Sequence, residues 1–227
     1  MKYADFENIM SMPRMNRYKQ ACGGDVRKAM TLYRKNLKLS QELFIVISCF
    51  EIALRNAIDK NYLRTLGSDW LRNAIASGGC FDDSRCAITQ RTIDEEIRSL
   101  RGPYTHHKLV AGLGFGFWRY MFGKHQYRLA GRTLLKIFPN RPSSSQTIQY
   151  NQNYVFQELK KINNIRNRIA HHEPICFQAN AAVKDTSYVR EHYDVIIELL
   201  YWMGINKDKF LYGLDNVLNG CNKIDTL

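Results

Sequence analysis

Apolar residues recur three and four positions apart along most of this chain, which is the spacing of one face of an α-helix. No sustained alternation of apolar and polar residues, the pattern of a half-buried strand, interrupts it. We therefore predict an all-α fold. Its central element is one long or broken helix that begins after Asp25 as N-cap and ends near Leu66. The apolar positions of this helix follow a heptad-like spacing: Leu43, Ile47, Phe50, Leu54 and Ala57.

The rest of the chain divides into shorter predicted helices. A short helix begins within residues 68–71, and another runs from about 82 to 100. Thr105 caps a helix that carries Leu109, Leu113, Phe117 and Met121 on one face, and a basic helix follows over about 125–138. Residues 139–145 form a linker rich in proline and serine. A long helix over about 146–172 then ends because Pro174 disfavours helical geometry at Glu173. Two closing helices lie within residues 187–220.

Length and composition favour one compact domain over residues 1–227, with the helices of residues 187–220 packed on it, because 227 residues of 45% hydrophobic composition can bury one substantial core. The longest apolar run, residues 43–50, is far shorter than the roughly 20 residues of a membrane-spanning helix. Acidic residues near the N-terminus do not fit a signal peptide, so we expect a cytoplasmic protein. The six cysteines form no C-x-x-C pair, and we expect reduced thiols, no metal site and no cofactor.

The positive charge of the chain is concentrated in two segments. The net charge is +12, and no Asp or Glu lies between Glu96 and Glu158, where nine Lys and Arg residues occur. Between Glu7 and Glu42 the only acidic residue is Asp25. Surfaces of one sign attract polyanions, and the release of counterions favours binding to phosphates, so nucleic acid is the favoured partner. Scattered solubilising cations and binding to a membrane surface remain the alternatives.

The strongest candidate for chemistry is the end of the helix predicted over 146–172. Asn167 and His171 are four residues apart and therefore neighbours on one face, which allows the amide to orient the imidazole. Arg166 lies about 140° around an ideal helix from His171, so its side chain must reach across or the helix must distort. A histidine that transfers protons and an arginine that stabilises phosphorane charge suffice for RNA cleavage without a metal. The alternative is that these residues are solvated and simply end the helix.

Other polar residues could support this group. Glu51 and Arg55 are four apart on a polar stripe of an apolar helix, and we expect this stripe to face the motif helix. They would position Arg166 or a phosphate, or form only an intrahelical ion pair. Arg168 and His172, also four apart, point elsewhere and are expected to contact RNA backbone or a partner subunit.

Two further patterns do not indicate a binding site. The run Gly112, Gly114 and Gly116 lacks the third glycine of G-x-G-x-x-G and the Gly-Lys-Ser/Thr of a phosphate loop, so it indicates close helix packing. His106, His107 and His125 have no partner at ligand spacing, and we interpret them as capping or surface residues.

The sequence R-N-R-I-A-H-H-E-P-I at residues 166–175 resembles the R-x4-H signature of HEPN (higher eukaryotes and prokaryotes nucleotide-binding) ribonucleases, in which Asn usually follows Arg. Its flanks resemble the Abi-like abortive-infection family. Further similar blocks are residues 33–40, 51–58 and 112–118, so the resemblance covers about 33–175.

This resemblance implies a HEPN-like helical bundle with additional helices, which forms a homodimer so that two motifs meet in one cleft. It implies a metal-independent endoribonuclease that acts in phage defence or as the toxin of a toxin–antitoxin system. Arg166 and His171 would be the catalytic pair and Asn167 the orienting residue, while His172 and Glu173 belong to the wider motif. The implied partners are RNA as substrate and an RNA or protein antitoxin.

Two alternatives stay open. The first is a non-catalytic RNA-binding protein that holds a small RNA or an antitoxin. The second is a purely structural helical partner protein.

Overall fold

The computed structural model describes residues 1–227 and contains twelve α-helices, two short 3-10 helices and no β-strand. A single isolated bridge joins Phe177 and Lys184. The predicted all-α class is therefore confirmed. None of the helices has both the length and the apolar character required to cross a lipid bilayer.

The chain forms two compact units. Unit 1 comprises residues Met1–Ser48, Asn164–Glu198 and Lys207–Leu227, and unit 2 comprises Cys49–Asn163 and Leu199–Asn206. Three helices contribute residues to both units: α3 (Val26–Leu66), α9 (Gln152–Ala170) and α10 (Ser187–Trp202). The other helices of unit 1 are α1 (Tyr3–Met10), α2 (Met12–Ala21), α11 (Lys207–Phe210) and α12 (Val217–Asp225). Those of unit 2 are α4 (Trp70–Ile75), η1 (Ser84–Cys86), α5 (Ala87–Ser99), α6 (His106–Gly112), α7 (Phe115–Tyr120), α8 (Lys124–Leu129) and η2 (Leu134–Ile137).

The long helix α3 begins as the sequence predicts. The Asp25 carboxylate accepts hydrogen bonds from the backbone N–H groups of Arg27, at 2.9 Å, and Lys28, at 3.0 Å. These bonds satisfy donors that the first helical turn leaves without partners. The bond from Lys28 in particular holds the pKa of the Asp25 carboxyl below its usual range. The helix then continues to Leu66 without a break.

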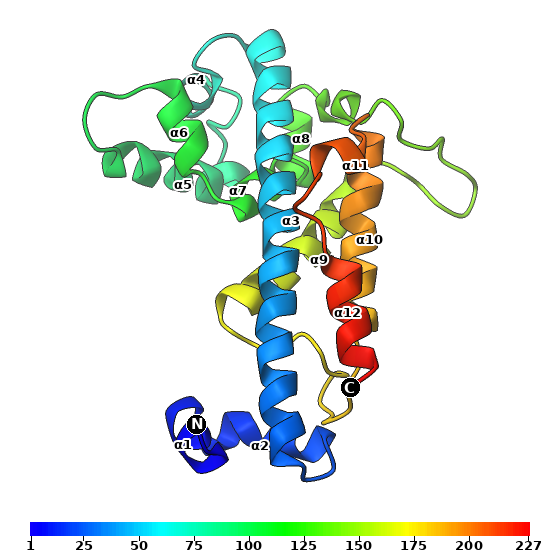
Figure 1. The fold of residues 1–227 in the computed structure, drawn as a ribbon. Coiled ribbons are helices and arrows are strands. Elements are labelled where there is room, and N and C mark those ends of the chain that lie inside the picture. Colours follow the sequence, from blue (N-terminus) through cyan, green and yellow to red (C-terminus); the bar gives the residue numbers. More distant parts are fainter. The chain divides into compact units, whose positions relative to one another are not determined.

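In unit 1, α12 lies beside the first half of α3 (Figure 1), and glycine allows this close approach. A Cβ atom added to Gly220 would lie 3.0 Å from Leu39 Cδ1. The Lys35 ammonium donates a hydrogen bond to the carbonyl of Lys223. The C-terminal helix therefore covers the half of α3 that belongs to unit 1.

The sequence patterns did not indicate α1 and α2, which aromatic packing attaches to unit 1. The Tyr33 ring on α3 meets Phe6 and Tyr18 edge-on, with centroids 5.5 and 5.1 Å apart. Tyr18 also packs on Phe177, at 4.9 Å. All four rings are buried, so tertiary contacts rather than a strong amphipathic pattern stabilise these two helices.

Several predicted helix boundaries were wrong because the chain breaks where glycine or a left-handed residue occurs. The helix predicted from Thr105 is two helices, α6 and α7, separated at Leu113, and the buried Trp118 indole donates to the Leu113 carbonyl at 2.9 Å. The basic helix predicted over 125–138 is only α8 and η2, because Gly131 and Arg132 have φ of +84° and +57°. The second of the two closing helices predicted within residues 187–220 is likewise two helices, α11 and α12.

The start of α9 also differs from the prediction. The helix begins at Gln152 rather than near residue 146. The Asn151 side chain accepts hydrogen bonds from the backbone N–H groups of Asn153, at 2.9 Å, and Tyr154, at 3.1 Å. Asn151 is therefore the N-cap, and the residues before it remain outside the helix.

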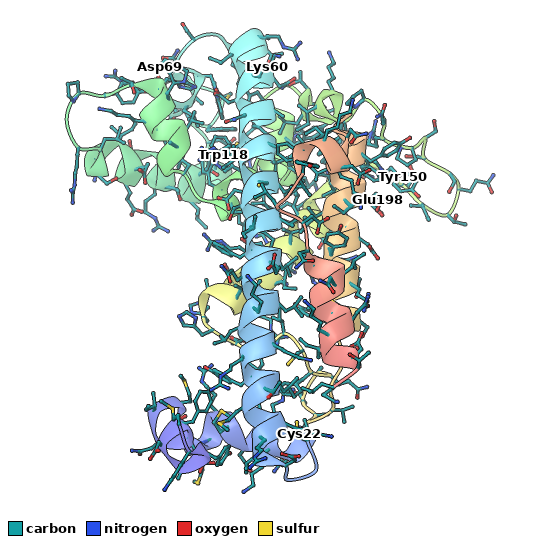
Figure 2. All side chains as sticks on the ribbon, viewed as in Figure 1. Cys22, Lys60, Asp69, Trp118, Tyr150 and Glu198 are labelled. Carbon is teal, nitrogen blue, oxygen red and sulfur yellow. The ribbon has the colours of Figure 1, made fainter.

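A buried polar cluster around Asp59 organises unit 2. The Asp59 carboxylate accepts a hydrogen bond from the buried Trp70 indole at 2.8 Å and lies 2.7 Å from His106 Nε2. Asp69, labelled in Figure 2, accepts a hydrogen bond from the Tyr104 hydroxyl and lies 3.5 Å from His106 Nδ1. The side chain of His106 is only 12% exposed. Its interpretation as a capping or surface residue was therefore wrong, because the two carboxylates that surround it come from other parts of the chain.

We expect Asp59→Ala to lower the free energy of unfolding by about 1–3 kcal/mol, because the Trp70 N–H would stay buried without an acceptor. Asp59→Asn retains an acceptor oxygen and should lose less. Urea denaturation followed by circular dichroism measures both changes. An unchanged free energy of unfolding in Asp59→Ala would show that this cluster does not stabilise the fold.

Candidate functional site

The candidate motif lies at the carboxyl end of α9, within unit 1. The helical bond from the His171 N–H to the Asn167 carbonyl, 2.9 Å long, is the last one of regular type. His172 then adopts a left-handed conformation, with φ of +56°. The N–H groups of His172 and Glu173 turn back to the carbonyls of Ile169 and Arg168, at 2.9 and 2.8 Å. This pattern is a left-handed C-terminal cap, which satisfies carbonyls that the helix end leaves without partners.

Arg168 holds the chain immediately after the helix. Its guanidinium donates to the carbonyl of Pro174 at 3.0 Å and forms an ion pair with the Glu173 carboxylate at 3.3 Å, without a hydrogen bond at Nε. The same guanidinium lies over the Tyr188 ring, 5.1 Å from its centroid. The side chain of Arg168 is thus engaged within its own chain, and its expected contact with RNA or a partner stays a prediction.

The three predicted catalytic side chains are not engaged in this way. Asn167 and His171 are exposed, and Arg166 is half-buried. The Arg166 Nε atom is shielded from solvent and has no hydrogen-bond partner. No intramolecular hydrogen bond or ion pair involves any of the three side chains, and the Asn167 amide does not contact the imidazole of His171 through a hydrogen bond. The exposed polar groups of Asn167 and His171 therefore face solvent without an intramolecular partner, whereas the Nε atom of Arg166 does not.

Residues that the sequence analysis did not single out hold the segment after α9. Arg14 of α2 donates to the carbonyl of His172 at 2.7 Å. Arg17, also on α2, donates to the carbonyls of Gln178 and Ala181, both at 2.8 Å. The helix α2 therefore fixes the backbone at His172 and in the segment that follows the motif.

Asn36 of α3 provides a buried attachment for the same segment. Its side-chain oxygen accepts a hydrogen bond from the Ile175 N–H at 3.0 Å, and both residues are almost completely buried. An asparagine on the apolar face of the helix, within the similar block at 33–40, was the one signal in the sequence for this role. The segment that follows the motif is thus attached to α9, α2 and α3.

A groove of about 310 Å³ borders the motif within unit 1. One side is formed by α3, where Leu37 and Phe44 are partly exposed, and the other by the last turn and cap of α9. Its lining residues are Asn36, Leu37, Ser40, Gln41, Phe44, Ile169, Ala170, His172 and Glu173. The groove places apolar surface directly beside His172 and Glu173.

Glu51 and Arg55 belong to unit 2. The Arg55 guanidinium donates to the carbonyl of Ala111 at 3.3 Å, and its Nε atom is shielded without a hydrogen-bond partner. Glu51 is half-buried and has an interaction partner. Their proposed support of Arg166 stays a prediction. No group of three or more His, Cys, Asp or Glu side chains could hold a metal ion, and the six cysteines are unpaired thiols.

Comparison with known proteins identifies one family. The sequence model of the Abi-like protein family matches residues 2–176. The matched region includes the motif. It also includes residues 2–32, which contain α1 and α2 and precede the resemblance seen in the sequence alone. No curated protein and no solved structure matches the chain.

The left-handed cap gives a prediction for His172. Non-glycine residues adopt this conformation at a cost of roughly 1–2 kcal/mol. Glycine avoids this cost, but its greater freedom in the unfolded chain cancels part of the gain in stability. We therefore expect His172→Gly to raise the free energy of unfolding by up to about 1 kcal/mol and the β-branched variant His172→Val to lower it. Thermal and urea unfolding of the two variants should shift in opposite directions, and a shift in the same direction would contradict this cap geometry.

The buried bond to Ile175 gives a second prediction. Asn36→Ala leaves the Ile175 N–H without an acceptor, which costs about 1–3 kcal/mol. Hydrogen exchange should become faster at the backbone amides of residues 172–178, because this attachment is lost. Leu37→Ala, a change at a partly exposed neighbour on α3, is the matched control. Equal exchange in the two variants would mean that Asn36 does not hold this segment.

Proposed function

Because the chain belongs to the Abi-like protein family, which points to a role in abortive infection, we propose that it is a metal-independent endoribonuclease of the HEPN type. Arg166 and His171 are its catalytic pair, and Asn167 is a polar residue that orients the substrate or the imidazole. RNA is the substrate. The enzyme acts in phage defence or as the toxin of a toxin–antitoxin system.

One observation carries this proposal: the end of α9 separates its polar side chains into two groups. Arg168 is bound to Pro174, Glu173 and Tyr188, whereas the side chains of Arg166 and His171 have no hydrogen-bond or ion-pair partner in the chain. An unpaired guanidinium and an exposed imidazole near one capped helix end are groups that a scissile phosphate requires. A net charge of +12 adds attraction for the polyanion.

The reaction needs one proton acceptor, one proton donor and one fixed cation. An imidazole removes the proton of the ribose 2′-hydroxyl, and the 2′-oxygen attacks the adjacent phosphorus. The bond from phosphorus to the 5′-oxygen breaks, and an imidazolium gives that oxygen its proton. The products are a 2′,3′-cyclic phosphate and a 5′-hydroxyl. The Arg166 guanidinium stabilises the charge that develops on the phosphorane oxygens.

A homodimer is part of this proposal. The reaction uses two proton-transfer groups, and each chain supplies one motif with one His171. The approximately 140° between Arg166 and His171 on an ideal helix also favours a phosphate that contacts residues from two copies. An antitoxin, either RNA or protein, would act by covering this shared site.

Incubation of the protein with total RNA or transfer RNA in excess EDTA should give cleavage. Arg166→Ala and His171→Ala should each lower the rate about 10²–10⁴-fold, because each removes a group that acts in the transition state. Arg64→Ala and His107→Ala remove the same residue types from exposed positions of unit 2 and should leave the rate unchanged.

An inert wild-type protein, or motif variants as active as the wild type, would contradict the proposal. The one-signed charge of residues 97–157 supports a second candidate, an RNA-binding protein without catalysis. Salt-sensitive RNA binding that survives His171→Ala, with no product formed by the wild type, would select this second candidate.

A further inference from the structure

Unit 2 contains a second pocket, of about 480 Å³, that the motif does not use. The helices α5, α7 and α8 and the first turns of α9 supply its walls, with η1 beside α8. The lining includes the side chains of Phe117, Tyr120, Lys124, His125 and Phe156. No Asp or Glu lines the pocket. Unit 2 by itself therefore supplies every wall of this pocket.

The aromatic part of the pocket is held in a fixed arrangement. Tyr120 is 46% exposed, and its ring meets Phe156 edge-on with the centroids 5.6 Å apart. The Arg119 guanidinium lies 4.6 Å from the Tyr120 centroid and 4.9 Å from that of Phe156. Trp118 of α7, labelled in Figure 2, is buried and attaches this helix to the preceding residues through its bond to the Leu113 carbonyl. An exposed ring fixed by a guanidinium is a surface on which a flat π-system can stack.

The charged part of the pocket is positive. Lys124 is exposed and has no ion-pair partner. Arg85 is neutralised, because its guanidinium donates to Asp83 at 2.8 Å and holds the pKa of that carboxyl well below its usual range. The Nδ1 atom of His125 is shielded from solvent and has no hydrogen-bond partner. Lys124 of the lining, with Arg119 packed against the Tyr120 and Phe156 rings, therefore supplies cationic charge that no acidic residue of the lining offsets.

The pocket also lies within the segment of the chain that contains no acidic residue. Residues 97–157 include every lining residue of α7, α8 and α9. A protein partner with an acidic surface could use this charge, but it would not need an open aromatic pocket next to it. A nucleotide matches both the aromatic rings and the positive charge, because it presents a π-face and a negatively charged phosphate a short distance apart.

We propose that this pocket binds an unpaired nucleobase and the adjoining phosphate of single-stranded RNA, with the base against Tyr120 and Phe156 and the phosphate at Lys124. Bases of a duplex are stacked on their neighbours and cannot enter, so the site selects single strands. The site does not require the motif in unit 1 to be catalytic. It would serve a ribonuclease or a non-catalytic RNA-binding protein equally.

The test uses full-length His171→Ala protein, in which the RNA stays intact, and a fluorescent short oligouridylate. Fluorescence anisotropy measures the dissociation constant. Tyr120→Ala should raise it about 5–100-fold, because one base loses its stacking partner, whereas Tyr120→Phe should keep it near the starting value. Lys124→Ala should weaken binding and reduce the salt dependence by about one counterion. Tyr212→Ala, at a tyrosine that is 87% exposed in unit 1, is the matched control.

Three results would overturn the proposal: no binding of the oligouridylate, the same dissociation constant in Tyr120→Ala and Tyr212→Ala, or an equal effect of Tyr120→Ala on an RNA duplex. Circular dichroism and thermal unfolding establish that each variant is folded. A change of mass in light scattering for Tyr120→Ala, with unchanged RNA binding, would instead identify the pocket as a contact between two copies. Absence of RNA cleavage by the wild type would contradict the proposed catalysis and leave this site standing.

Discussion

The candidate site depends on how α9 ends. A helix end leaves carbonyl groups without partners, and here the chain satisfies them by turning through a left-handed residue, His172, rather than through glycine. Arg14, Asn36 and Arg168 then fix the segment that follows. Because the backbone is held from three sides, His171 can remain exposed at the helix end and still occupy a defined position. The fixed backbone, rather than burial of the side chain, therefore positions the imidazole.

Two arginines two residues apart have different surroundings as a result. Arg168 is bound by a carbonyl, a carboxylate and an aromatic ring, so its charge is used within the chain. Arg166 has no such partner, and its Nε atom is shielded from solvent without a hydrogen bond. The sequence motif alone does not distinguish these two environments. The distinction follows from which face of the helix end meets Pro174 and Tyr188.

The positive charge of the chain extends beyond either proposed site. The stretch without acidic residues supplies walls of the aromatic pocket in unit 2, and the motif in unit 1 adds cationic donors of its own. An enzyme that cleaves a long polyanion gains from contacts beyond the scissile phosphate, because remote binding energy can hold the substrate in place during the reaction. The two proposed sites would thus serve one class of ligand, the site in unit 1 through proton transfer and the site in unit 2 through stacking.

The sequence by itself determined the helical class, the start of α3 at Asp25 and the end of α9 before Pro174, because helical periodicity, an N-cap and the geometry before proline act over a few residues. It also contained the motif of Arg166 and His171. Only the tertiary structure decided that α7 separates from α6, that His106 lies between two carboxylates and that Asn36 binds the chain after the motif. These features depend on which distant groups supply hydrogen bonds and cover apolar surface, and a linear pattern of residues does not specify those partners.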